Sequence, residues 1–326
     1  MDISCAFAPV SATPEHIQLA EGLGYRRAWV FDTPALQLDV WATLALAAVR
    51  TKRIELGPGV LIPSLRHVVV TASAVATLVG LAPGRVNVGL GTGFSGRFTM
   101  GKKPNRWDFV ADYARQLKAL LAGETAEVDG AMTRMLHGPG QAPPRPIRVP
   151  ILFATAGPRG EAIARELGDG VFTVIPIGGF SWESLLTQGT VLEPGEDFGS
   201  PRARAAAGAG ASVVFHRAWD RPAPGRPKLA ELDGGLEWRA RIEAIDPAVR
   251  HLHTHEGHLT FVNEIDEKVI NGALIRDLTF TGEADVLRER LEDRACRGVT
   301  EIAYQPAGPD IPRELRAFAQ MAGISR

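Results

Sequence analysis

Residues 53–94 read RIELGPGVLIPSLRHVVVTASAVATLVGLAPGRVNVGLGTGF, in which two apolar runs each end in a glycine-rich turn. The turns are Gly57-Pro-Gly-Val60 and Gly89-Leu-Gly-Thr-Gly93, and the alanine-rich segment between them stops before Pro83-Gly84. This order predicts strand, helix, strand. Parallel strands present ligand sites at their carboxyl ends. Bare glycine backbone at two neighbouring ends therefore predicts a shelf for a flat ligand.

A helix that ends in glycine and leads at once into an apolar strand recurs along the chain. The three copies are LAEGLG (19–24) before 27–31, IARELG (163–168) before 170–174, and LEDRACRG (291–298) before 299–304. We expect each glycine to close its helix in the left-handed conformation, which costs glycine nothing. Helix into buried strand, repeated from end to end, is typical of parallel βα units.

The chain contains eight candidate strands with helices between most of them. The strands are predicted at 2–8, 27–31, 53–60, 85–90, 150–154, 170–174, 211–216 and 299–304. The helices are predicted near 14–23, 39–50, 68–81, 106–122, 158–167, 182–188 and 283–297. This count favours a single α/β domain over 1–326, a (β/α)8 TIM barrel with insertions after strands 4 and 7, over an open sheet.

Two segments interrupt the alternation. Residues 124–148 predict a hairpin that turns at Asp129-Gly130, followed by a proline-rich link. Residues 217–265 are irregular and follow the seventh predicted strand. Because that strand would end at the catalytic face of a barrel, we expect 217–265 to form a lid.

Composition limits the classes of function. Hydrophobic residues make up 45% and charged residues 22%, and Lys+Arg total 36 against Asp+Glu 37, so no nucleic-acid partner is expected. Two cysteines, Cys5 and Cys296, suit a reducing compartment. The first residues lack a basic segment, and the apolar stretch 68–82 is too short for a membrane span. We expect a cytoplasmic enzyme.

Two predicted helices are apolar almost all round, at 39–49 and 68–81. An outer barrel helix should show one polar face to water. The two helices are therefore predicted either to form a homodimer interface or to lie beneath the chain's own insertions.

The glycine motifs allow two further interpretations. A dinucleotide fingerprint would need its glycines to open a helix directly, whereas residues 93–105 form a loop before the helix at Arg106, so a nicotinamide site is disfavoured. Gly57-Pro-Gly59 indicates a bulge, either at a simple barrel corner or where the backbone must accommodate a ligand.

Five runs together resemble the bacterial-luciferase-like family of flavin- and deazaflavin-dependent oxidoreductases, in particular its methylenetetrahydromethanopterin reductase-like branch. The runs are GPGVLIPSLRH (57–67), APGRVNVGLGTG (82–93), RWDFVADYARQLKALLAGE (106–124), FATAGPRGEAIARELGDGVF (153–172) and TFTGEADVLRERLEDRACRGVTEIAY (279–304). Residues 176–265 match least.

The resemblance implies a TIM barrel, usually dimeric, that binds reduced FMN or coenzyme F420 across the strand ends. A bulge with a non-prolyl cis peptide commonly supports the ring, and by position it is Gly59-Val60, with Asp32 and Thr33 beside it. Many members have histidine where this chain has Thr33, so histidine-based proton transfer is not expected there. Gly91, Thr92 and Gly93 would form the floor under the ring.

A phosphate position follows from the fifth strand. Thr155, Ala156 and Gly157 lead into Pro158, which suits the first position of a helix. The N–H groups of Arg159 to Glu161 are then expected to be free and, with the helix dipole, to bind a ligand phosphate. An ordinary helix cap is the alternative. The basic loop 95–107 could guide an anionic coenzyme or simply be solvated.

Histidines supply the remaining candidates. The run HLHTHEGH (251–258) could bind a metal, which would make the protein a metal-dependent hydrolase, but it is not a rigid strand end, and we expect no metal site. His258 would instead face substrate from the lid. His216, at the end of a predicted strand, is a candidate proton donor, and Asp32 completes the catalytic set. His67 also flanks a strand end.

The predicted function is hydride transfer from reduced coenzyme F420 to a small organic substrate. The alternative is a two-component monooxygenase that receives reduced FMN from a separate flavin reductase, and the hydrolase is a distant third.

Overall fold

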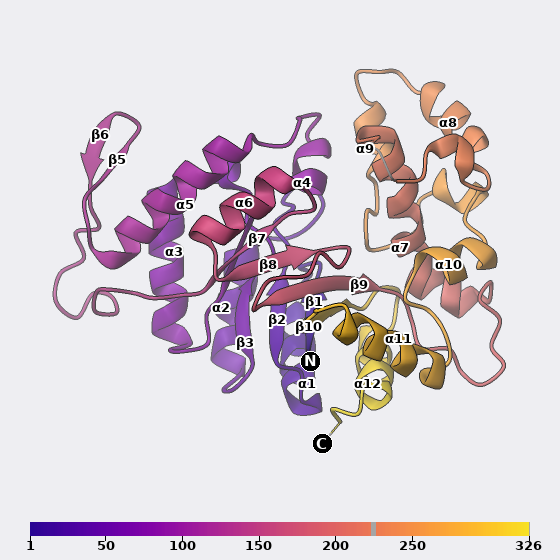
Figure 1. Cartoon of the computed structure of the whole chain (residues 1–326), viewed down its shortest axis with the longest axis horizontal. Coiled ribbons are helices and arrows are strands. Elements are labelled where there is room, and N and C mark those ends of the chain that lie inside the picture. Colours follow the sequence, from indigo (N-terminus) through magenta and orange to yellow (C-terminus); the bar gives the residue numbers. More distant parts are fainter. Residues whose placement is uncertain (223–225, 326) are drawn as a thin grey trace.

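Eight parallel strands form one sheet that curves into a barrel (Figure 1). The computed structural model describes residues 1–222 and 226–325. In spatial order the strands are β3 (Glu55–Pro58), β2 (Arg27–Val30), β1 (Asp2–Phe7), β10 (Glu301–Gln305), β9 (Glu183–Gln188), β8 (Gly170–Thr173), β7 (Ile151–Ala154) and β4 (Val88–Gly91).

Strands β3 and β4 close the barrel across the glycine-rich turns. The Leu56 N–H donates to the Arg85 carbonyl at 2.7 Å, and the Leu61 N–H donates to the Gly89 carbonyl at 2.8 Å. These bonds lie on either side of the bulge at residues 58–60. The TIM-barrel prediction is confirmed.

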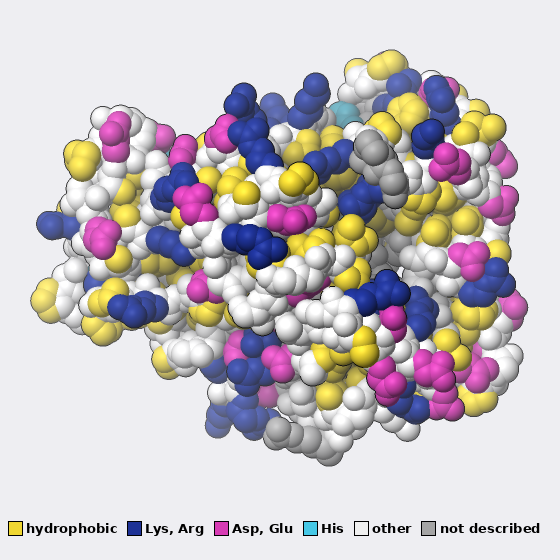
Figure 2. Space-filling view, viewed as in Figure 1, with side chains coloured by type: hydrophobic (Ala, Val, Ile, Leu, Met, Phe, Trp, Pro, Cys, Tyr) yellow, Lys and Arg dark blue, Asp and Glu magenta, His cyan; other side chains and the backbone are white. Residues whose placement is uncertain are grey.

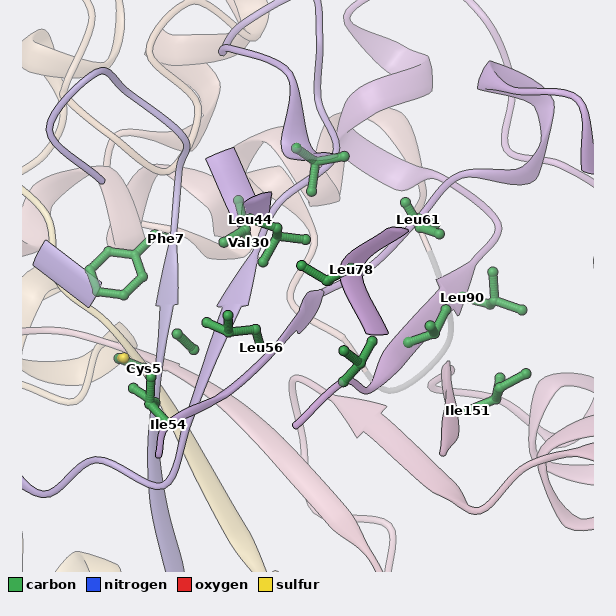
Figure 3. Close-up of a cluster of buried hydrophobic side chains, with 14 of the residues drawn as sticks. Cys5, Phe7, Val30, Leu44, Ile54, Leu56, Leu61, Leu78, Leu90 and Ile151 are labelled. Atoms are coloured by element: carbon green, nitrogen blue, oxygen red, sulfur yellow. The ribbon is translucent and has the colours of Figure 1, made fainter. Parts of the chain in front are cut away.

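Helices cover the outside of the barrel. They are α1 (Thr13–Leu23), α2 (Val40–Arg50), α3 (Val68–Leu81), α5 (Trp107–Ala122), α6 (Pro158–Leu167), α11 (Ala284–Cys296) and α12 (Ile311–Met321). The short helix α4 (Phe94–Phe98) lies instead at the carboxyl ends of the strands, within the predicted loop 93–105. Figure 3 shows part of the apolar layer between strands and helices, where Leu56 and Leu90 of the sheet lie near Leu44 and Leu78 of α2 and α3. Within the described residues, no helix is long and apolar enough to cross a bilayer.

The recurring glycines act in two ways. Gly24 and Gly298 follow α1 and α11 with φ values of 96° and 90°, as predicted. The prediction is wrong for Gly168, whose φ is −100°. A Cβ at Gly168 would lie 2.8 Å from the Ala164 carbonyl oxygen and 2.9 Å from the Phe153 ring. Glycine is needed there because α6 meets β7 closely, and left-handed backbone plays no part.

Two predicted elements exchange their types. Residues 211–216 are helical rather than a strand, since they continue α7 (Pro201–Asp220), which Ser200 caps through a 3.1 Å bond from the Ala203 N–H. Within the predicted helix 182–188, residues 183–188 form β9 instead, with parallel neighbours on both sides. Alanine-rich sequence on the N-terminal side extends the helix through Val213 and Val214, and pairing with two strands outweighs the local preference of 183–188.

The insertions follow the fourth and seventh strands. Within 124–148, β5 (Ala126–Val128) and β6 (Ala131–Thr133) form an antiparallel hairpin. Between β9 and α11 lie α7, α8 (Gly235–Glu243), α9 (Arg250–Thr254) and α10 (Gly272–Leu278), which share a second apolar core and stand beside the barrel in Figure 1. This layer contains the predicted lid 217–265, of which 223–225 lie outside the described residues.

Candidate active site

A cavity of about 260 Å3 lies at the carboxyl ends of the strands. That is near the lower end of the range, about 300–1,000 Å3, that small-molecule sites occupy. Most of the predicted site residues line it, namely Asp32, Thr33, Gly59, Val60, Gly91, Thr92, Gly93, Thr155, Ala156 and His258. Gly157, Pro158, Arg159 and His216 are outside its lining.

The floor of the cavity is Val60, held above two glycines of β4. The peptide bond between Gly59 and Val60 is cis, as the resemblance implied. A Cβ on Gly89 would lie 2.6 Å from Val60 Cγ1, and a Cβ on Gly91 would lie 2.8 Å from Val60 Cγ2. Only glycine therefore lets β4 pass this close beneath Val60. The arrangement makes a flat apolar floor.

The bulge is fastened by Asp32, which follows β2 and is buried. Both Asp32 carboxylate oxygens accept from Arg66 Nη1 at 2.7 Å, and one accepts from the Ile62 N–H at 3.2 Å. Burial raises the pKa of Asp32, and the Arg66 guanidinium opposes that rise. Asp32 thus ties β2 to the segment that carries Val60. Its neighbour Thr33 hydrogen bonds Gln37.

The N-terminus of α6 adjoins the cavity through Thr155 and Ala156. Among the described residues, the N–H groups of Arg159 and Gly160 have no backbone acceptor, as predicted. The prediction is wrong for Glu161, whose N–H donates to the Gly157 carbonyl at 3.1 Å. The Arg159 guanidinium pairs with Asp108 of α5. A Cβ on Gly157 would meet no atom within 4 Å.

Four buried or half-buried polar side chains form a chain that starts at the cavity wall. Ser95 Oγ lies 2.8 Å from His258 Nε2, and His258 Nδ1 lies 2.9 Å from His216 Nδ1. His216 Nε2 lies 3.0 Å from Asp266 Oδ2. The prediction that His216 ends a strand is wrong, since it lies on α7. Sequence reasoning missed Ser95 and Asp266 because each is an ordinary residue in an irregular segment.

The carboxylate at the end of this chain sets the tautomers. Asp266 accepts, so His216 carries its proton on Nε2 and its Nδ1 accepts from His258 Nδ1–H. His258 Nε2 is then free to accept from the Ser95 hydroxyl. Burial, followed by the nearby His216 and His255, lowers the pKa of His258 well below its usual range. His258 is therefore neutral at neutral pH.

A third buried imidazole, His255, completes a cluster with His216 and His258. One ring nitrogen from each lies within 4.8 Å of the other two, a spacing that could also hold a metal ion. His255 Nε2 faces Asp220 Oδ2 at 3.0 Å. Both ring nitrogens of His216 and of His258 are used in the chain from Ser95 to Asp266, so a metal held by the three rings would replace at least one of these hydrogen bonds. His251 and His253 lie outside this cluster.

The low pKa of His258 predicts how stability changes with pH. An unfolded histidine has a pKa of about 6.5, so in mildly acidic solution the unfolded chain binds a proton that the folded chain refuses. We expect the free energy of unfolding to fall by about 1–2 kcal/mol between about pH 7 and about pH 5 from this group. Urea titrations of the native protein and His258→Gln should show a smaller loss for the variant.

The matched control is His253→Gln, which removes an exposed histidine from the same segment. It should lose stability with acid as the native protein does. An equal acid response in His258→Gln and the native protein would contradict the assignment of a depressed pKa to His258.

The sequence profile of the luciferase-like monooxygenase family matches residues 5–182, more than half of the chain. The chain belongs to the luciferase-like family. The matched part includes both glycine-rich turns, Asp32 and the start of α6.

Curated relatives of this luciferase-like protein include a reductase. A 5,10-methylenetetrahydromethanopterin reductase of Methanolobus tindarius is 32% identical over 168 residues, 50% of each chain. The chain thus spans about half the length of the curated relatives it matches.

Two solved structures share its fold. The coenzyme F420 dependent tetrahydromethanopterin reductase from Methanopyrus kandleri superposes with a TM-score of 0.68 at 21% identity over 98% of both chains. The oxygenating constituent of 3,6-diketocamphane monooxygenase from Pseudomonas putida, in complex with FMN, superposes with a TM-score of 0.65 at 13% identity over 100% of this chain and 99% of that one.

Proposed function

We propose that this luciferase-like protein is an oxidoreductase that uses reduced coenzyme F420 on a small organic substrate. The observation that carries the proposal is the floor, where Val60 lies on glycines that leave no room for another side chain and faces an open cavity. A flat ring fits such a floor, and the relatives that are named as F420-dependent dehydrogenases support F420. When bound, the reduced coenzyme supplies a hydride.

The protein's own residues position the ring and handle the proton. Asp32 is a positioning residue, because its oxygens are engaged by Arg66 and Ile62 and so hold the bulge that carries Val60. Reduction of the substrate requires a proton as well as the hydride, and water supplies it through the Ser95 hydroxyl. The neutral Nε2 of His258 holds that hydroxyl in place, and His216 with Asp266 holds the imidazole in this tautomer.

We place the coenzyme's phosphate at the start of α6. Gly157 tests this placement, because a Cβ there meets nothing in the protein but would stand where a phosphate approaches the free N–H groups. Gly157→Ala should leave the melting temperature within about 2 °C of native and weaken coenzyme binding about tenfold. Fluorescence titration measures the affinity and calorimetry the melting.

Gly22→Ala is the control, since its Cβ also meets no atom within 4 Å but lies on α1, away from the cavity. If Gly157→Ala bound the coenzyme with native affinity, the placement of the phosphate at the start of α6 would be wrong.

We propose that the layer α7–α10 acts as the lid. It contributes Val213, His258 and Leu259 to the cavity wall. A cover of this kind excludes water from the reacting groups.

We propose a homodimer joined through α2 and α3, which pack beside each other. Leu46 and Val49 on α2 are 50% and 64% exposed, and Val70 on α3 is 55% exposed. Sedimentation should show a dimer at micromolar concentration, and Val49→Glu should shift it toward monomer. Free Cys5 and Cys296 suit a cytoplasmic location.

The deciding experiment titrates the purified protein with reduced and oxidised coenzyme F420 and with FMN, following fluorescence, alongside elemental analysis. Tight binding of F420 is expected. Binding of FMN alone would favour the monooxygenase supplied by a separate flavin reductase, for which the FMN-bound neighbour is the supporting observation. Binding of neither, or one zinc per chain on the three histidines, would overturn the proposal.

A further inference from the structure

Three arginines meet at the side of the cavity formed by the end of α7. Arg217 and Arg221 line the cavity, and Arg226 lies close enough to Arg217 to lower its pKa. Burial and then the charges of Arg226 and Arg221 lower the pKa of Arg217 to about 10. Figure 2 shows Lys and Arg side chains in the hollow between the barrel and the layer α7–α10.

These guanidiniums have no acidic partner among the described residues. Within 1–222 and 226–325, the charges that act on Arg217 and Arg226 come from neighbouring arginines, and no carboxylate faces either guanidinium. The lining of the cavity contains one carboxylate, Asp32, which is already bound by Arg66. The carbonyl end of α7 offers only about half a negative charge.

Arg217 and Arg226 are half-buried, and Arg221 is exposed. Partial burial of cations that repel one another is costly unless an anion compensates them. Two half-buried arginines on the barrel are compensated by carboxylates: Arg27 pairs with Glu55 and Glu301, and Arg66 pairs with Asp32. Others are stabilised without an acid, since Arg290 donates to backbone carbonyls and Arg294 lies over the Phe280 ring. Arg217 and Arg221 differ from all of these in that they line the cavity, where an anionic ligand can reach them.

We propose that the substrate is an amphiphilic acid, whose carboxylate or phosphate is bound by Arg217 and Arg221 while its apolar body lies against Val174, Leu186 and Val213. Those three side chains line the same cavity. Guanidinium groups bind carboxylates and phosphates through paired, charge-assisted hydrogen bonds. This inference names the substrate class of the proposed oxidoreductase and rests on that function.

The coenzyme is the other possible source of negative charge. The proposed position of its phosphate is the start of α6, on the barrel, whereas Arg217 and Arg221 belong to the layer that stands beside the barrel in Figure 1. The two proposed anion positions thus belong to different parts of the fold. The substrate's acid belongs at Arg217, the neighbour of His216 on α7.

The test uses the full chain, with and without coenzyme F420, and three probes that share an eight-carbon chain: octanoate, octyl phosphate and octan-1-ol. Calorimetric titration is expected to show binding of at least one acid and no comparable binding of the alcohol. Arg217→Gln should weaken binding of that acid about tenfold to a hundredfold and leave the dissociation constant of the coenzyme unchanged. Arg217→Lys, which keeps the charge, should recover part of the loss.

Arg239→Gln is the matched control, since it removes an exposed arginine of α8 in the same layer. Equal binding of acids and alcohol, or equal acid affinity in Arg217→Gln and Arg239→Gln, would overturn the inference. Weaker coenzyme binding in Arg217→Gln would assign the arginines to the coenzyme instead. If F420 binds to no form of the protein, the proposed function fails, and the titrations without coenzyme decide the acid preference by themselves.

Discussion

Asp32→Ala is expected to destabilise the protein by about 3 kcal/mol, because it leaves the buried Ile62 N–H and the Nη1 of half-buried Arg66 without their acceptor. Asp32 accepts from Arg66 Nη1 and from the Ile62 N–H, and both contacts hold the segment after β3. Coenzyme affinity should fall as well, since this segment carries Val60. Urea denaturation and fluorescence titration measure the two effects.

Two further variants test whether the loss of stability comes from the Ile62 contact or from the Arg66 contact. Asp32→Asn keeps an oxygen for the Ile62 N–H and should recover part of the stability. Asp39→Asn removes the exposed second partner of Arg66, which lies 2.9 Å away, and should cost less than about 1 kcal/mol. Similar losses for Asp32→Ala and Asp39→Asn would show that Asp32 does not anchor the bulge.

Gly91→Val is expected to weaken coenzyme binding at least about a hundredfold, the second large effect. A Cβ at Gly91 already meets Val60 Cγ2 at 2.8 Å and Ala154 Cβ at 3.2 Å. The added methyl groups must either push Val60 into the cavity or enter the cavity themselves. In both cases the flat floor is lost. Overpacking of this kind also costs about 1–3 kcal/mol of stability.

The comparison with Gly22→Ala, which adds an unhindered Cβ on α1, separates folding from binding. A Gly91→Val protein that folds and still binds the coenzyme with native affinity would show that the ring does not lie on this floor. A substitution at Gly59 tests the floor less well than one at Gly91, because a Cβ on Gly59 would lie 2.8 Å from Trp29 Cβ inside the barrel and not in the cavity.

The barrel was largely predictable because its signals are local. Apolar runs that end in glycine, such as 53–59 and 85–91, carry their strand character and their turn in a few adjacent residues. The exchange of type between 182–188 and 211–216 shows the limit. A six-residue apolar segment is helix or strand according to what flanks it and what pairs with it.

The candidate site likewise contains residues that local sequence could predict and residues that it could not. Gly91 could be found because close backbone approach demands glycine at particular positions, and Gly59-Val60 could be found through the resemblance of the run GPGV to the family. Arg217 could not be found, because a helical arginine is predicted to face solvent unless the tertiary structure is known to place it at a cavity. His216 was chosen from the right residue type but for the wrong reason, as the end of a strand.

By itself, the sequence determined the parallel βα order and the glycine floor, since both depend on residues that are neighbours along the chain. Only the tertiary structure decided which polar groups face that floor. Ser95 and His258 are 163 residues apart, and His216 and Asp266 are 50 apart. The first contact depends on how the layer α7–α10 packs on the barrel and the second on how the layer packs within itself. No local pattern of residues encodes either packing.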